Sequence, residues 1–72
     1  MGKEVVVRIT LNGAEREVEP GTTIAQLIDE ITKDRTRVAV ERNRAIAPRA
    51  TWEQSLVAEG DEIEVVTLVG GG

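Results

Sequence analysis

Hydrophobic residues recur at every second position near the start of the chain. They occupy positions 5, 7, 9 and 11, and from residue 8 on, charged or polar residues separate them. A period of two predicts a strand that buries one face. Asn12-Gly13 follows and favours a tight hairpin turn, because both of its residues tolerate a positive φ. Residues 14–19 are then expected to return as a charged strand at the edge of a sheet, with Val18 facing inward.

The spacing of hydrophobic residues becomes helical after Pro20-Gly21. Thr23 and Gln26 have the spacing of a capping box, in which each side chain bonds the backbone of the other residue. The apolar residues that follow lie three and four positions apart: Ile24, Leu27, Ile28 and Ile31. This period predicts a helix with one face in the core, followed by a loop at residues 33–35.

The second half of the sequence favours three more strands. Residues 38–40 and 45–47 are short apolar segments on either side of a turn at Asn43, and Pro48 ends the second of them. Thr51 and Gln54 repeat the spacing of a capping box, so residues 52–56 are expected to form one short helical turn. Residues 62–68 are the last predicted strand.

The expected order is therefore two strands, a helix, two strands, a short helical turn and a final strand. One helix and one sheet must bury each other's apolar faces, since neither has another partner. This arrangement is the ubiquitin-like β-grasp, an α+β fold with a mixed sheet of four to five strands packed on one main helix. We expect residues 1–68 to form a single domain and residues 69–72 to form a flexible C-terminal tail.

Composition narrows the possible functions. The 72 residues include neither cysteine nor histidine, so a metal site of the zinc type and the usual nucleophile–base pairs lack their commonest side chains. We expect no metal site, no bound cofactor and no intrinsic catalytic residue. The net charge of −4 argues against a nucleic-acid partner. No apolar segment has the length of a membrane span or of a signal-peptide core, so the expected location is the cytoplasm.

The sequence ends in three consecutive glycines, Gly70, Gly71 and Gly72. Residues without a side chain can thread a narrow channel, because no Cβ meets its walls. Such a tail would deliver the carboxylate of Gly72 into the active site of a partner. Because an ionised carboxylate is a poor electrophile, another enzyme would have to activate it with ATP, most simply as an acyl adenylate. A frayed terminus without function is the alternative interpretation of the glycines.

A possible docking surface leads along the last strand toward these glycines. Val66 and Leu68 have the parity of the face turned away from the helix, and Val6 and Ala39 can point the same way on the first and third strands. If these three strands are neighbours, the four residues form an exposed apolar patch, which is typical of a partner-binding surface. Isolated surface valines are also ordinary.

Charged residues gather in two regions. Five arginines between residues 35 and 49 are interpreted as a solvated rim, since no aromatic platform for nucleic acid accompanies them. Trp52, the single aromatic residue, is expected to anchor the core. An acidic group near the last strand favours docking to a basic partner, and its members are Glu59, Asp61, Glu62 and Glu64.

Specific motifs occur along the whole chain. They are Leu11-Asn12-Gly13, residues 19–23, residues 38–43, Pro48-Arg49 with Trp52, residues 60–64 and the ending at residues 69–72. Together they resemble the ThiS family, the sulfur carrier proteins of thiazole formation in thiamin biosynthesis. The Gly-Gly ending alone is shared by all ubiquitin-like carriers, whereas the middle and C-terminal motifs are more specific.

The resemblance implies that the protein is a carrier and not an enzyme. In the family, a ThiF-type adenylyltransferase uses ATP to adenylate the C-terminal glycine. Sulfur derived from a cysteine desulfurase then converts the adenylate into a thiocarboxylate, and a ThiG-type thiazole synthase takes that sulfur. Carried over to this chain, Gly72 is the modified residue, while Gly70 and Gly71 belong to the tail that enters the partner.

Two other functions fit the same residues. A sulfur carrier of another pathway, such as the small subunit of molybdopterin synthase, would share the fold and the thiocarboxylate. A ubiquitin-like modifier or a pure interaction domain would use the same tail or the same surface. Composition and spacing are equally compatible with sulfur and with another cargo.

Overall fold

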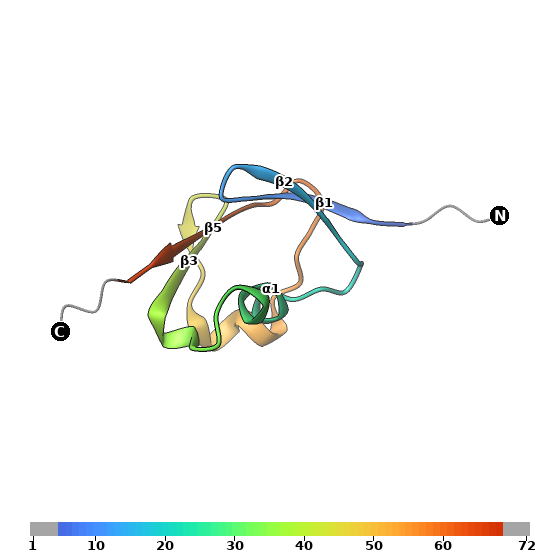
Figure 1. Ribbon diagram of the computed structural model, residues 1–72. Helices are drawn as coiled ribbons and strands as arrows, with labels where there is room; N and C mark the ends of the chain where they lie inside the picture. The colour runs from blue at the N-terminus through green and yellow to red at the C-terminus, as the bar shows by residue number, and fades with distance from the viewer. Residues whose placement is uncertain (1–4, 69–72) are drawn as a thin grey trace.

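The computed structural model describes residues 5–68 and contains one α-helix packed on a five-stranded mixed sheet (Figure 1). The strand order is β2-β1-β5-β3-β4, so that β5 lies in the middle, parallel to β1 and antiparallel to β3. This arrangement confirms the predicted β-grasp. The strands are β1 (Val7–Leu11), β2 (Ala14–Val18), β3 (Val38–Arg42), β4 (Ala45–Ile46) and β5 (Glu62–Thr67), and the helices are α1 (Ile24–Ile31) and two 3-10 helices, η1 (Arg35–Arg37) and η2 (Arg49–Gln54).

The first hairpin forms as its sequence predicts. Asn12 and Gly13 have φ angles of 52° and 84°, which are the positive values that a tight turn between right-twisted strands requires. The strand on the other side of the turn, β2, is an edge strand of the sheet. One expectation is wrong, because β1 begins at Val7 and the side chain of Val5 is 73% exposed.

Helix α1 begins with the predicted capping box. The Gln26 amide donates to Thr23 Oγ1 over 3.1 Å, and the Thr23 amide donates to Gln26 Oε1 over 2.9 Å. The first two turns bury Ile24, Leu27 and Ile28, as their spacing predicts. Ile31 was expected in the core and is instead 44% exposed. It is the last residue of the helix, where the chain turns away toward η1.

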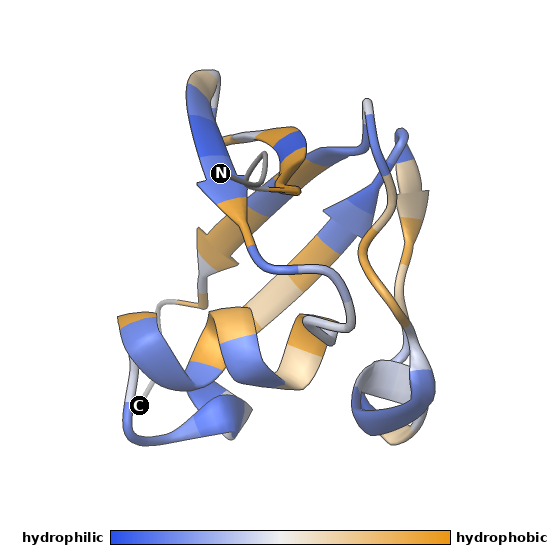
Figure 2. Cartoon of the chain, turned by 90° about the vertical axis from the view of Figure 1, so that its right-hand side faces the viewer, coloured by the Kyte–Doolittle hydropathy of each residue, from blue (hydrophilic) through white to orange (hydrophobic). Residues whose placement is uncertain are grey.

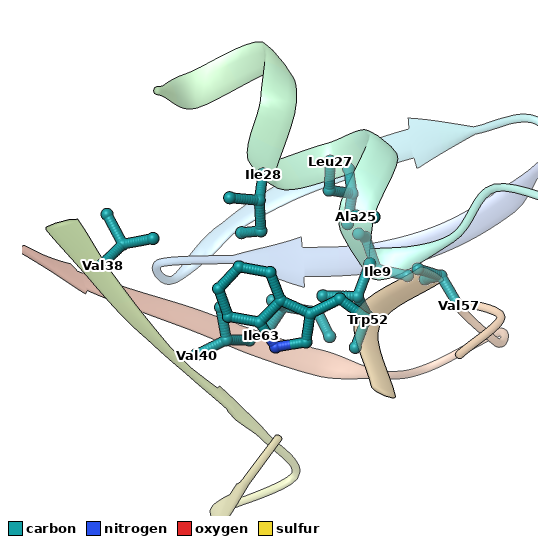
Figure 3. Close-up of a cluster of buried hydrophobic side chains, with 10 residues drawn as sticks. Ile9, Ala25, Leu27, Ile28, Val38, Val40, Trp52, Val57 and Ile63 are labelled. Carbon is teal, nitrogen blue, oxygen red and sulfur yellow. The ribbon is translucent and has the colours of Figure 1, made fainter. Parts of the chain in front are cut away.

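The core lies between α1 and the inner face of the sheet. Figure 3 shows the indole ring of Trp52 between the helix and the strands, and its side chain is fully buried. The indole Nε1 donates to the Ala47 carbonyl over 2.8 Å, so the one polar atom of the ring is satisfied. In Figure 2, hydrophobic positions lie along the strands and on α1, whereas the turns are hydrophilic.

The short helix that carries Trp52 differs from its prediction. It is a 3-10 helix over Arg49–Gln54, not a turn over residues 52–56. The expected capping box is absent from it, since the Thr51 hydroxyl donates backward to the Pro48 carbonyl over 2.7 Å. Pro48 is therefore the residue before the helix, and its fixed φ of −62° leads the chain into the turn.

In the turn between β3 and β4, two residues other than glycine adopt left-handed backbone geometry. Asn43 has a φ of 53° and Arg44 a φ of 71°. Asn43 tolerates this conformation, and its side chain also accepts from the Glu62 amide over 2.9 Å. Arg44 lacks the short polar side chain that lets asparagine adopt this conformation, and left-handed geometry is unfavourable for a residue with a Cβ.

Asp61 ties this turn to the beginning of β5. Its carboxylate is buried and accepts from the Ala58 amide at 2.8 Å, from Asn43 Nδ2 at 3.1 Å and from Arg42 Nη2 at 2.7 Å. Burial acts to raise the pKa of Asp61, but the three donors outweigh it and the pKa is lowered. Asp61 therefore stabilises the fold, and its expected place in an acidic docking group is wrong.

Substituting Asp61→Ala tests this network. The change leaves Ala58 N–H and Asn43 Nδ2 without their acceptor, so we expect the free energy of unfolding at pH 7 to fall by about 2 kcal/mol. The ionised carboxylate stabilises the fold above the pKa of an unfolded aspartate, about 3.9, and this contribution is lost as the pH falls through the lower pKa of the folded protein. Urea unfolding of both proteins at pH 7, 5 and 3 measures the difference. A difference that stays constant down to pH 3 would contradict the assignment.

Candidate functional site

The candidate site begins where β5 leaves the sheet. The register pairs Thr10 with Glu62 and Leu11 with Ile63, after which β1 ends in its turn. The turn residue Asn12 then accepts from the Val65 amide over 2.8 Å. Beyond this point β5 has only β3 beside it, and the end of β5 lies far from the N-terminal side of the molecule (Figure 1).

Apolar side chains gather on the outer face of this end of the sheet. Ala39 and Val66 are direct cross-strand partners, and Val66 is 50% exposed. Leu68 continues the same parity and is 47% exposed. Strand β4 adds Ile46, which is opposite Glu41 and diagonal to Ala39. We call Ala39, Ile46, Val66 and Leu68 the outer patch.

Ile46 was missed by the sequence prediction although it is 67% exposed. It stands in a strand of two residues, which is too short to show a period. Only the pairing of β4 with β3 shows that Ile46 lies on the outer face. Pro48, shortly after it, was the one sequence signal of an edge position.

Val6 does not belong to the outer patch, in contrast to its prediction. Strands β1 and β5 are parallel, and Thr10 is the partner of Glu62. Val6 precedes Thr10 by four residues and Val66 follows Glu62 by four, so about 26 Å of strand separates them at about 3.3 Å per residue. Val6 instead lines a groove between β2 and α1. Sequence parity predicts which face a residue occupies, but pairing register decides where along the sheet it lies.

Acidic side chains border the outer patch. Glu41 and Glu64 are direct cross-strand partners on the outer face. A single inward-facing pair, Val40 and Val65, separates them along the strands from Ala39 and Val66. Like charges in this position repel one another. Within residues 5–68 neither of them takes part in a salt bridge, whereas neighbouring Glu62 lies 4.0 Å from Arg44. The face next to the end of β5 therefore combines exposed apolar area with unneutralised negative charge.

The arginines of the middle third form intramolecular ion pairs. Arg35 donates to both carboxylate oxygens of Asp29, at 2.8 and 2.9 Å, and to Glu53 at 3.1 Å. The hydrogen bond from Arg35 lowers the pKa of Asp29 below its usual value. Arg37 lies 3.5 Å from Asp34. The pairs of Arg35 and Arg37 agree with the interpretation of the arginines as a solvated rim, whereas Arg42 pairs with the buried Asp61 and belongs to the framework of the fold.

The part of the chain that the structure describes contains no group of three or more potential metal ligands. None of the helices within residues 5–68 is long and apolar enough to cross a membrane. The residues predicted to react or to thread, Gly70, Gly71 and Gly72, lie outside the described residues, as does the predicted tail as a whole.

The fold and the exposed face define a small β-grasp domain whose central strand leads directly to a glycine-rich ending. The chain belongs to the ThiS family, whose model matches residues 9–72. Comparisons with individual proteins extend this result.

The sulfur carrier protein ThiS of Escherichia coli is 27% identical over 66 residues, which cover 92% of this chain and 100% of that protein. The crystal structure of the thiamine biosynthesis protein ThiS from Geobacter metallireducens superimposes with a TM-score of 0.73 at 26% identity, covering 92% of this chain and 100% of that one. A thiazole synthase of Paramagnetospirillum magneticum is 38% identical over 66 residues, covering 92% of this chain. The chain spans only about a fifth of the length of that synthase, since the match covers 20% of it.

Removing one charge of the Glu41–Glu64 pair tests whether these carboxylates repel one another. We expect Glu64→Gln to raise the free energy of unfolding by a few tenths of a kcal/mol at low ionic strength, because directly opposed like charges destabilise a sheet. The gain should shrink at about 1 M salt, which screens exposed charges. Denaturant unfolding measures both values. The matched control is Glu15→Gln, because Glu15 stands opposite the uncharged Thr10 on the same sheet. An equal gain in the control would contradict the repulsion.

Proposed function

We propose that this protein is a sulfur carrier of thiamin biosynthesis and that Gly72 carries the sulfur as a thiocarboxylate. The observation that carries the proposal is the family match, which runs through the whole fold and includes the glycine ending. The full-length correspondence with the sulfur carrier protein ThiS of Escherichia coli supports it. The protein is then a co-substrate of other enzymes and not an enzyme itself.

The chemistry requires a free carboxylate at Gly72. An oxygen of this carboxylate attacks the α-phosphate of ATP on a ThiF-type adenylyltransferase, and pyrophosphate leaves. The terminal sulfur of a persulfide made by a cysteine desulfurase then adds to the acyl carbon, and AMP leaves with the electrons of the broken C–O bond. A thiol then cleaves the S–S bond of the resulting acyl disulfide, which releases the thiocarboxylate and leaves the two other sulfurs as a disulfide. Glycine suits the first two steps because it has no side chain to hinder the approach to its carbonyl. ATP is bound by the partner, and this chain needs no cofactor of its own.

The folded body supplies docking. A partner that covers the outer patch removes apolar area from water next to the point where the chain leaves β5. Basic groups on that partner would neutralise Glu41 and Glu64, which stand directly opposite one another on β3 and β5. The proposed surface therefore selects a partner that is apolar at its centre and basic at its rim.

A ThiG-type thiazole synthase is the proposed acceptor of the sulfur. The support is that a thiazole synthase of Paramagnetospirillum magneticum contains a segment similar to this chain. Two functions joined in one polypeptide meet at a high effective concentration, which is useful when one passes a group to the other. The use of ATP and of a desulfurase fits a location in the cytoplasm.

Intact mass spectrometry tests the carrier function. After incubation with the adenylyltransferase, ATP, a cysteine desulfurase with its substrate and a thiol reductant, we expect a mass increase equal to the replacement of one oxygen by sulfur. Fragmentation should localise it to Gly72. The control chain lacks Gly72 and should remain unmodified while its melting temperature is unchanged, because a terminal glycine has no side chain to bury. An unmodified full-length chain, with enzymes that load a known carrier, would contradict the proposal.

Substituting Val66→Glu tests the docking surface. The change places a third carboxylate beside Glu41 and Glu64 and removes apolar area from the outer patch. We expect the Kd for the adenylyltransferase to rise at least tenfold, which is about 1.4 kcal/mol. The matched control is Val5→Glu, because Val5 is a still more exposed valine at the other end of the sheet. Titration calorimetry without ATP measures both, and an equal loss of affinity at Val5 would count against the outer patch.

A further inference from the structure

Leu68, the last described residue, follows β5 and is bonded to a different part of the molecule than that strand. The Leu68 amide donates to the Arg37 carbonyl over 2.7 Å, one step beyond the pairing of Thr67 with Val38. Arg37 belongs to the 3-10 helix η1 and not to a strand. The direction in which the chain leaves the domain therefore depends on the position of η1.

Helix η1 is in turn held by Asp34. The Asp34 Oδ1 atom accepts from the Thr36 amide at 3.0 Å and from the Thr36 hydroxyl at 2.6 Å. The Asp34 carbonyl accepts from the Arg37 amide at 3.0 Å, and its Oδ2 lies 3.5 Å from Arg37 Nε. These hydrogen bonds from Thr36, together with the charge of Arg37, lower the pKa of Asp34, so the carboxylate is ionised at neutral pH.

The same turn is connected to helix α1. The Asp34 amide donates to Thr32 Oγ1 over 3.1 Å, and the Thr32 amide donates to the Ile28 carbonyl over 2.9 Å. Since Ile28 is fully buried, the path ends in the core. We call Thr32, Asp34, Thr36 and Arg37 the exit brace, because together they connect the packed helix to the Leu68 amide.

The length of the chain beyond Leu68 makes this connection important for the proposed function. Residues 69–72 can span at most about 14 Å. The volume within which the Gly72 carboxylate can be found is therefore centred on Leu68, and a firmly held Leu68 keeps that volume small, whereas a reacting carboxylate must lie within about 3.5 Å of its target. If Leu68 moved freely, it would have to be ordered at each encounter with a partner. The cost of that ordering would lower the fraction of encounters in which Gly72 reaches its reacting position.

We propose that Asp34 is a positioning residue for the adenylation of Gly72, acting through η1 on the direction of the chain at Leu68. The inference rests on the proposed carrier function and adds a second determinant to it. The outer patch determines whether a partner docks, and the exit brace determines how often the docked tail is correctly placed.

The proposal separates docking from turnover. In Asp34→Ala the acceptor of both Thr36 hydrogen bonds is lost. Three of the four residues of the outer patch, Ala39, Ile46 and Val66, are held by strand pairing that the change does not touch, and only Leu68 is shared with the exit brace. We expect kcat for pyrophosphate release by the adenylyltransferase to fall about fivefold, which is about 1 kcal/mol. The Kd measured without ATP should stay within twofold of that of the unchanged chain. Hydrogen exchange at the Leu68 amide should accelerate by a similar factor, because its bond to Arg37 is broken more often.

Two further variants make the test specific. Asp34→Asn keeps the side-chain oxygen that accepts from Thr36, so it should restore most of kcat and of the protection at Leu68. Thr51→Val removes the corresponding hydroxyl bond of the other 3-10 helix, from Thr51 to the Pro48 carbonyl, and should change neither quantity. If kcat fell only because a 3-10 helix is destabilised, Thr51→Val would lower kcat as well.

The outcomes distinguish this inference from the function on which it rests. If the unchanged chain is adenylated and Asp34→Ala has the same kcat, Asp34 is not a positioning residue. A raised Kd with an unchanged kcat would likewise overturn the inference, because it would place Asp34 in the docking surface. If the unchanged chain is not adenylated by an enzyme that is active on a known carrier, the proposed function fails, and the inference fails with it.

Discussion

The insertion of β5 between β1 and β3 is the contact on which the molecule depends. Each of the two hairpins, β1–β2 and β3–β4, is closed by its own turn, and the sheet connects them only through β5. The parallel pairing with β1 is short, but bonds from the Thr10 amide to the Asp61 carbonyl and from the Asn12 amide to the Ile63 carbonyl, both 2.9 Å, extend it. Ile63 anchors the strand because it is fully buried under α1.

One strand therefore serves both the fold and the proposed carrier function. The inward side chains of Ile63 and Val65 belong to the core or pack against it, and the outward side chains of β5 lie beside Ala39 and Glu41 on an exposed face. The carboxylates Glu41 and Glu64 are like charges placed directly opposite one another, and Val66 leaves half of its area exposed after folding. Such positions are explained more readily by a surface that becomes covered than by the stability of the free protein.

Two parts of the structure bear on the proposed chemistry at Gly72. The outer patch lies next to the end of β5, and the exit brace carries rigidity from the buried Ile28 to the Leu68 amide. For the proposed carrier function, the contribution of these two parts to a reaction consists of affinity for a partner and direction of the chain. Both depend on how firmly the last strand is held by its neighbours.

The sequence by itself determined the turns and the start of the main helix, because these depend only on residues close together in the chain. Asn12-Gly13 and Asn43 specify turns because few residues tolerate a positive φ, and Thr23 with Gln26 specifies a helix start because the two bonds form within one turn. The period of the apolar residues was sufficient for the β-grasp, and the motifs of the whole chain were sufficient for the ThiS family. Only the tertiary structure decided which residues share a place on the sheet. Pairing register removed Val6 from the outer patch and added Ile46 to it, and burial beside Arg42 made Asp61 part of the framework. Register and burial arise from contacts between residues far apart in the chain. A pattern along the sequence can predict which face of a strand a residue occupies, but it cannot predict which residues of the other strands lie beside it.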